Sequence, residues 1–205
     1  SPASPTYRRL AAALVTRLAE RYAQHPAVVM WHVNNEYGCH VSRCYCDVSA
    51  AAFRAWLLRR YGSIAELNRV WGTAFWSQRY DSFEEIMPPR AAPSFRNPTQ
   101  LLDFDRFSSD ELLDCYRAEV EIIRGRSPIP VTTNFMGFFK PVDYWKWARE
   151  VDVVTDDSYP DPADPISPAF GAMVRDLIRS LGDGAPWMLM EQSPSAVNWR
   201  RRNAA

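Results

Sequence analysis

The pattern of apolar and polar positions divides the chain into alternating helices and short strands. Apolar residues recur every three to four positions over residues 7–24, which predicts a helix capped by Thr6 and stopped ahead of Pro26. Residues 28–33 form a short, nearly continuous apolar run, typical of a parallel strand covered on both sides. A helix that leads directly into such a strand favours an α/β architecture. One apolar face of the helix comprises Tyr7, Leu10, Ala11, Leu14, Leu18 and Tyr22.

The same alternation continues to the end of the chain. Ser49 is placed to cap the next helix, and Ser63 with Glu66 fits a capping box for the one after it. Residues 73–99 follow no regular pattern and are rich in aromatic residues and proline, and a loop of this length is usually functional. The pattern predicts helices over 50–62, 64–72, 99–124, 142–150 and 170–181, and strands over 131–134, 151–155 and 187–190.

Each expected strand ends in polar residues. In parallel α/β barrels the active site is built at the C-terminal ends of the strands. A doubly wound sheet also binds ligands there, but it usually carries a glycine-rich phosphate loop after its first strand, and this sequence has none. The alternation therefore predicts a partial barrel in one domain over residues 1–205. The four polar endings are Asn35 with Glu36, Asn134, Asp157 with Ser158 and Tyr159, and Glu191 with Gln192.

Composition narrows the class of protein. Hydrophobic residues make up 47% of the 205 residues and charged residues 23%, as in ordinary globular proteins. Lys+Arg and Asp+Glu both number 24, and this lack of excess positive charge argues against nucleic acid or a membrane surface as a partner. The N-terminus lacks a signal pattern, and three of the four cysteines crowd into residues 39–46, so we expect a reducing, cytoplasmic compartment.

Two of the strand-end residues are glutamates, Glu36 and Glu191. Carboxylates at the ends of separate strands of one barrel can face each other across a pocket, as glycoside hydrolysis requires. One protonates the leaving oxygen while the other attacks the anomeric carbon. The plainer interpretation is that both are surface carboxylates, as most glutamates are. The pairing of each with a preceding apolar strand favours the catalytic interpretation.

Several motifs then occur in a familiar order: "NNEYG", "CYC", "WGTAFWSQRY", "TTNFMGFF", "DSYP" and "MEQSPSAVNW". Together they resemble glycoside hydrolase family 42, the β-galactosidases of the clan-A barrels. The resemblance implies a TIM (β/α)8 barrel, of which this chain would supply about strands four to seven. The first three strands, the eighth strand and the later domains of the family would be missing. The implied activity is retaining, exo-acting hydrolysis of terminal β-D-galactosyl residues.

The resemblance also assigns roles to residues. Glu36 looks like the acid/base and Glu191 like the nucleophile, while Asn35 would bind the sugar 2-hydroxyl and Trp199 would line the galactose pocket. A related exo-glycosidase such as an α-L-arabinopyranosidase remains an alternative, as does a non-catalytic carbohydrate-binding module. A binding module gains nothing from a second like-charged carboxylate. The family also implies a small-molecule β-galactoside substrate and a trimeric parent. Further candidates for the pocket wall are Asn134, Phe135, Asp157 and Tyr159.

No cofactor is required by this chemistry, but many members of the family carry a structural zinc held by four cysteines. Cys44 and Cys46 match two of its ligands, whereas Ser49 stands in the third place and the remaining ligand is expected upstream of this chain. A neutral hydroxyl is a poor zinc ligand beside thiolate, so zinc is not expected. Cys39 or Asp47 could substitute only with a different loop geometry.

One thiol and one aromatic side chain, those of Cys115 and Trp71, are expected to serve packing and not the site. Cys115 falls within the predicted long helix and is expected to serve packing. Trp71, at the start of the irregular segment, is also expected to pack against the domain rather than to wall a site.

Overall fold

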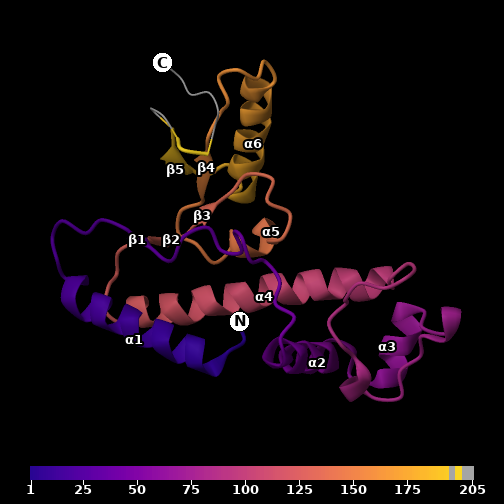
Figure 1. The fold of residues 1–205 in the computed structure, drawn as a ribbon. Helices are drawn as coiled ribbons and strands as arrows, with labels where there is room; N and C mark the ends of the chain where they lie inside the picture. Colours follow the sequence, from indigo (N-terminus) through magenta and orange to yellow (C-terminus); the bar gives the residue numbers. More distant parts are fainter. Residues whose placement is uncertain (194–196, 200–205) are drawn as a thin grey trace.

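The computed structural model describes residues 1–193 and 197–199. In the part of the chain that the structure describes, helices and short strands follow one another in the predicted order, with three α-helices between the first and second strands (Figure 1). The elements in order are α1 (Pro5–Tyr22), β1 (Trp31–His32), α2 (Asp47–Tyr61), α3 (Ile64–Trp71), the 3-10 turns η1 (Phe75–Ser77) and η2 (Phe83–Glu85), α4 (Pro98–Arg124), β2 (Val131–Thr132), β3 (Asn134–Phe135), α5 (Tyr144–Trp147), β4 (Thr155–Ser158), α6 (Ser167–Leu181) and β5 (Met188–Gln192).

All strand pairs of the described residues are parallel. β1 pairs with β2, and β3, β4 and β5 form a second ladder in that order. β2 and β3 are two halves of the single strand predicted over 131–134, separated at Thr133. The chain therefore runs through four successive parallel strand positions, and the other edge of β1 has no pairing strand among the described residues.

Three strand boundaries differ from the sequence prediction. β1 spans only two residues of the apolar run, β4 begins where the expected 151–155 strand ends, and β5 continues through Glu191 instead of stopping before it. Val154 is buried in the core, but ladder pairing starts at Thr155, opposite Asn134. The polar residues that follow stay in strand conformation because their buried side chains find hydrogen-bond partners inside the protein.

The helix starts were predicted less well than the helices. Ser4, not Thr6, caps α1, since its side chain accepts from the N–H of Tyr7. α2 begins at Asp47 with Cys46 at the N-cap, so Ser49 lies inside the helix and the cap predicted for it was wrong. Ser63 caps α3 by accepting from the Glu66 N–H, as predicted. Several polar residues near a helix start can each serve as its cap, and the backbone conformation ahead of the helix decides which one does.

The buried side chains form two clusters that share α4. One cluster surrounds the strands with the second half of α4, α5 and α6, and contains Cys115, which confirms its packing role. The other joins α2 and α3 to the first half of α4, away from the strands (Figure 1). Trp71 is buried in this second cluster and donates from Nε1 to Asp103, so it serves packing as expected. No helix of the described residues is long and apolar enough to cross a membrane.

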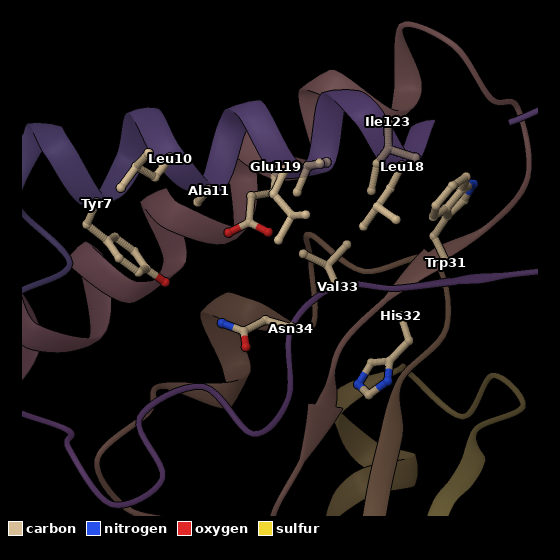
Figure 2. Close-up of a pocket in the computed structure, with 12 residues that line it drawn as sticks. Tyr7, Leu10, Ala11, Leu18, Trp31, His32, Val33, Asn34, Glu119 and Ile123 are labelled. Atoms are coloured by element: carbon tan, nitrogen blue, oxygen red, sulfur yellow. The ribbon is translucent and has the colours of Figure 1, made fainter. Parts of the chain in front are cut away.

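α1 lies beside α4 and turns much of its apolar face toward open space (Figures 1 and 2). Leu10 is 56% exposed and Leu14 is 62% exposed, and Ala19 is the buried residue of the helix. Together with Trp31 and Val33 of the β1 segment, this face lines a groove of about 440 Å³. A continuous apolar groove of this kind usually marks a surface that another element or partner covers.

Candidate active site

Glu36 sits in a tight turn directly after β1. The backbone adopts positive φ at Asn34 (57°), Glu36 (43°) and Gly38 (85°). Such a conformation disfavours residues with a Cβ and persists where the surroundings hold it. Gly38 is required at its position, because a Cβ there would also lie 3.2 Å from a side-chain carbon of Leu112. The turn therefore bends the chain so that Glu36 lies over the end of the sheet.

Glu191 and Asp157 come together through strand pairing. β4 and β5 are in parallel register, with an irregularity between Asp156 and Asp157. After this bulge Asp157 pairs with Glu191. A bulge re-aims the side chains that follow it, and bulges occur often beside active sites. Two carboxyl groups of neighbouring strands are thereby placed at the same end of the sheet.

Asn134 connects these two carboxyl groups to the Glu36 turn. It is 2% exposed, and its Oδ1 accepts from the Glu36 backbone N–H at 2.8 Å. Its Nδ2 lies 2.6 Å from Asp157 Oδ2 and 3.3 Å from Glu191 Oε1. The same Nδ2 lies 3.1 Å from Asn35 Oδ1. One buried amide thus contacts residues from three strand ends.

Three carboxyl groups meet at this point. One oxygen each from Glu36, Asp157 and Glu191 lies within 4.8 Å of the other two, and all three residues are partly or fully shielded from solvent. Burial, followed by the charge of Glu191, raises the pKa of Asp157 to about 8. Burial also raises the pKa of Asp156 to about 6, although the Gly137 N–H donates to it at 2.7 Å.

An aromatic wall flanks Glu191. Tyr159 donates a short hydrogen bond from its hydroxyl to Glu191 Oε2. Burial first, and then this bond, raise the Tyr159 pKa, so the phenol remains a hydrogen-bond donor. The ring of Trp199 meets the Tyr159 ring edge-on at 5.2 Å and is 64% exposed. Trp199 thus joins the site through Tyr159, with more than half of its indole exposed.

The comparisons with known proteins identify the family. The glycoside hydrolase family 42 model, described as beta-galactosidase, matches residues 1–205. The chain belongs to glycoside hydrolase family 42. Beta-galactosidase BgaB of Geobacillus sp. (strain Y412MC61) is 58% identical over 191 residues, covering 93% of this chain and 28% of the relative. Beta-galactosidase LacZ of Heyndrickxia coagulans is 53% identical, covering 99% of this chain and 30% of the relative.

Solved structures of this family match the fold as well. The beta-galactosidase from Bacillus circulans sp. alkalophilus superposes with a TM-score of 0.91 at 45% identity, covering 100% of this chain and 30% of that one. The enzyme from the psychrophilic Marinomonas ef1 gives a TM-score of 0.92 at 39% identity, covering 99% of this chain and 34% of that one. The chain thus spans about 30% of the length of these family 42 relatives.

The structure brings most of the predicted site residues together. Asn134, Asp157 and Tyr159 all contact Glu191 or lie beside it, and Asn35 joins them through Asn134.

Phe135 was expected to line the pocket wall, and the structure contradicts this. It is 1% exposed and stacks on Tyr144 with ring centroids 4.2 Å apart. Alternation along β3 explains the difference, because successive side chains point to opposite faces of a strand. Of the "MEQSPSAVNW" motif, residues 194–196 lie outside the described residues.

Two neighbours of Glu36 and Asn134 were missed by the sequence reasoning. His32 Nε2 lies 2.9 Å from Asn134 Oδ1 and donates to it. Burial, followed by a hydrogen bond with Glu36, raises the pKa of the Cys39 thiol. His32 did carry a signal, since it is the single polar residue within an apolar run of 28–33. Cys39 was weighed only as a metal ligand.

The residues of the family zinc site fit a metal poorly. Cys44 and Cys46 have their sulfurs 3.4 Å apart, and Cys46 Sγ lies 3.8 Å from Ser49 Oγ. Ser49 Oγ lies 2.8 Å from Ser1 Oγ, so the described residues gather only two thiols and two hydroxyls at this place. Neither Cys39 nor Asp47 joins the pair, because the acidic trio of the active site is the one close group of potential ligands among the described residues. Hydroxyls cannot replace thiolates in a tetrahedral zinc site.

Proposed function

We propose that the protein containing this chain is a retaining β-galactosidase that removes terminal, non-reducing β-D-galactosyl residues. The observation that supports this most directly is the approach of Glu36 and Glu191, whose oxygens lie within 4.8 Å of each other at the ends of different strands. Retaining glycosidases hold their two carboxyl groups about 5–5.5 Å apart, whereas inverting enzymes leave room for a water molecule between them. The separation here suits direct attack by a carboxylate.

The reaction then proceeds by two displacements. Glu36, as a carboxylic acid, protonates the glycosidic oxygen while the Glu191 carboxylate attacks the anomeric carbon and expels the aglycone. The product of this step is a galactosyl ester on Glu191. Glu36, now a carboxylate, takes a proton from water, and the water oxygen displaces Glu191 from the sugar. Each displacement inverts the anomeric centre, so the configuration is retained overall.

The surrounding side chains support these steps. The amide of Asn35 turns its oxygen toward Asn134, so its NH₂ group is directed elsewhere and can donate to the sugar 2-hydroxyl. The Tyr159 hydroxyl holds Glu191 by one oxygen, which orients the other toward the sugar. Trp199, exposed and packed edge-on against Tyr159, offers its face to the ring of the galactose.

We further propose that the chain is the middle of a catalytic TIM barrel, with strands four to seven, and that the preceding strand packs beside β1. Four successive parallel strand positions and a shared site at their C-terminal ends support this arrangement. The open edge of β1 and the apolar groove along α1 are where a preceding strand and its helix would lie (Figure 2).

Two further proposals concern the compartment and the assembly. The free thiols support a reducing, cytoplasmic compartment. The family resemblance supports a homotrimer, which light scattering would test.

The identity of the two carboxylates is tested in the complete enzyme with a nitrophenyl β-galactoside. Glu191→Ala should lower turnover by about three orders of magnitude or more, because the ester no longer forms. Added azide should then yield the α-galactosyl azide, since azide attacks from the side that the nucleophile vacates. With Glu36→Ala, azide should yield the β-galactosyl azide, because the Glu191 ester still forms and azide takes the place of water.

The control variant is Glu66→Gln, an exposed carboxylate paired with Arg69 on the surface of α3, and it should retain full turnover. A single azide anomer from both alanine variants would contradict the assigned roles. A wild-type enzyme that binds galactosides without hydrolysing them would reject the hydrolase in favour of a binding module. Faster turnover of an α-L-arabinopyranoside than of the galactoside would change the assigned substrate but leave the proposed mechanism in place.

A further inference from the structure

The buried amide of Asn134 makes more polar contacts than any other side chain of the site. Its Oδ1 accepts from the Glu36 N–H at 2.8 Å and from His32 Nε2 at 2.9 Å. Its Nδ2 faces three oxygens, those of Asp157, Asn35 and Glu191, at 2.6, 3.1 and 3.3 Å respectively.

These contacts use the full hydrogen-bonding capacity of the amide. A carboxamide oxygen has two lone pairs, and both have donors here. The nitrogen has two hydrogens, and three oxygens compete for them. Asn134 is also 2% exposed. It therefore has neither a free donor nor a free acceptor with which to bind a sugar hydroxyl, in contrast to the substrate contact that its position at a strand end suggested.

What the amide holds is the geometry of the reacting groups. The Glu36 backbone is in the left-handed region at φ 43°, which a residue with a Cβ adopts only when its surroundings enforce it. The bond from the Glu36 N–H to Asn134 is such a constraint. On the other side, Nδ2 approaches Glu191, so one rigid group of β3 spans both glutamates.

We propose that Asn134 is a positioning residue that fixes Glu36 relative to Glu191 and orients Asn35, and that it does not itself contact the sugar. This inference rests on the proposed glycosidase function of the same site. The unequal distances show which contact mainly anchors the amide, since Nδ2 is closest to Asp157 and farthest from Glu191.

The test uses the complete enzyme with two changes at Asn134 and one matched control. Asn134→Ala removes every contact. Asn134→Asp keeps the acceptor for Glu36 but places an oxygen where Nδ2 approached Glu191. Asn68→Ala is the control, because Asn68 is also a buried amide, 8% exposed, whose side chain bonds both the N–H and the C=O of Tyr80. It lies in α3, away from the strands (Figure 1).

Asn134→Ala should lower kcat about 100-fold, the effect of a misplacement near 1 Å, with KM changed by less than about threefold. Asn134→Asp should also lower kcat with little change in KM, because it keeps the acceptor for the Glu36 N–H but loses the donor that faces Glu191. Asn68→Ala should lower the melting temperature while leaving kcat and KM unchanged. A raised KM at unchanged kcat for Asn134→Ala would show a substrate contact and overturn the proposal.

A crystal structure of the Asn134→Ala enzyme tests the positioning role of Asn134 independently of activity. Relaxation of Glu36 to negative φ, or a changed separation of the Glu36 and Glu191 carboxyl groups, supports the proposal. An unchanged turn and an unchanged separation overturn it, even if the enzyme is slower. A wild-type protein without galactosidase activity would refute the proposed function, and the same crystal structure would still decide whether Asn134 holds the turn.

Discussion

Asp157 is the carboxyl group of the site whose pKa is raised furthest, and replacing it by Asn removes that carboxyl group. Asp157 is 9% exposed, its Oδ1 is buried without a hydrogen-bond partner, and Glu191 lies beside it. Burial and that neighbouring charge raise its pKa from 3.8 to about 8. The substitution keeps the shape of the side chain and an oxygen that can accept from Asn134, so the perturbation is mainly the loss of the titrating proton.

The sign of the effect follows from the raised pKa. Between about pH 4 and about pH 8 the folded protein keeps a proton on Asp157 that the unfolded chain has released. The folded state binds more protons, so its stability falls as the pH rises through this window. One proton corresponds to a slope of at most about 1.4 kcal/mol per pH unit. Asp157→Asn has no proton to lose, so the variant should gain stability relative to the wild type as the pH rises.

Urea unfolding of the complete enzyme measures this difference at about pH 5 and about pH 8.5, on either side of most of the titration. The midpoint of Asp157→Asn should exceed that of the wild type by more at the higher pH. Asp176→Asn is the matched control, since Asp176 is an exposed carboxylate paired with Arg179 on α6, and its midpoint should follow the wild type. Curves for Asp157→Asn and the wild type that stay parallel at both pH values would refute the reasoning.

The remaining predictions concern the second cluster, one turn and the cysteines. Asp103 is fully buried and accepts from Tyr61 and Trp71, so Asp103→Ala leaves both donors without their acceptor and should cost about 2 kcal/mol or more in urea unfolding, and a cost below about 1 kcal/mol would contradict a structural role. Gly137 has φ 60°, and a Cβ there would lie 3.1 Å from Val174, so Gly137→Ala should destabilise by about 1 kcal/mol or more in thermal unfolding. Metal analysis after dialysis against a weak chelator should find no stoichiometric zinc, because the Ser49 hydroxyl is a poor ligand beside the thiols of Cys44 and Cys46, and retained zinc would overturn that expectation.

The sequence determined those features that depend on neighbours along the chain. Helical periodicity located the helices, and the long α4 begins within one residue of its predicted start. The change from apolar to polar residues at each strand end located the candidate site, including Glu36, Asn134 and Glu191. Chain direction alone brings these ends together once the strands are parallel, so no long-range information was needed.

The tertiary structure decided what depends on register and on contacts across the sheet. One extra residue in β5, Met190, shifts the pairing so that Asp157 lies opposite Glu191, and no sequence pattern marks a bulge of that kind. Asn134 and Phe135 are adjacent in β3, yet one is the centre of the site and the other packs on Tyr144. Strand alternation separates the two, but which face meets the site is fixed only when β3 pairs with its neighbours, because side-chain direction reverses with a shift of a single residue.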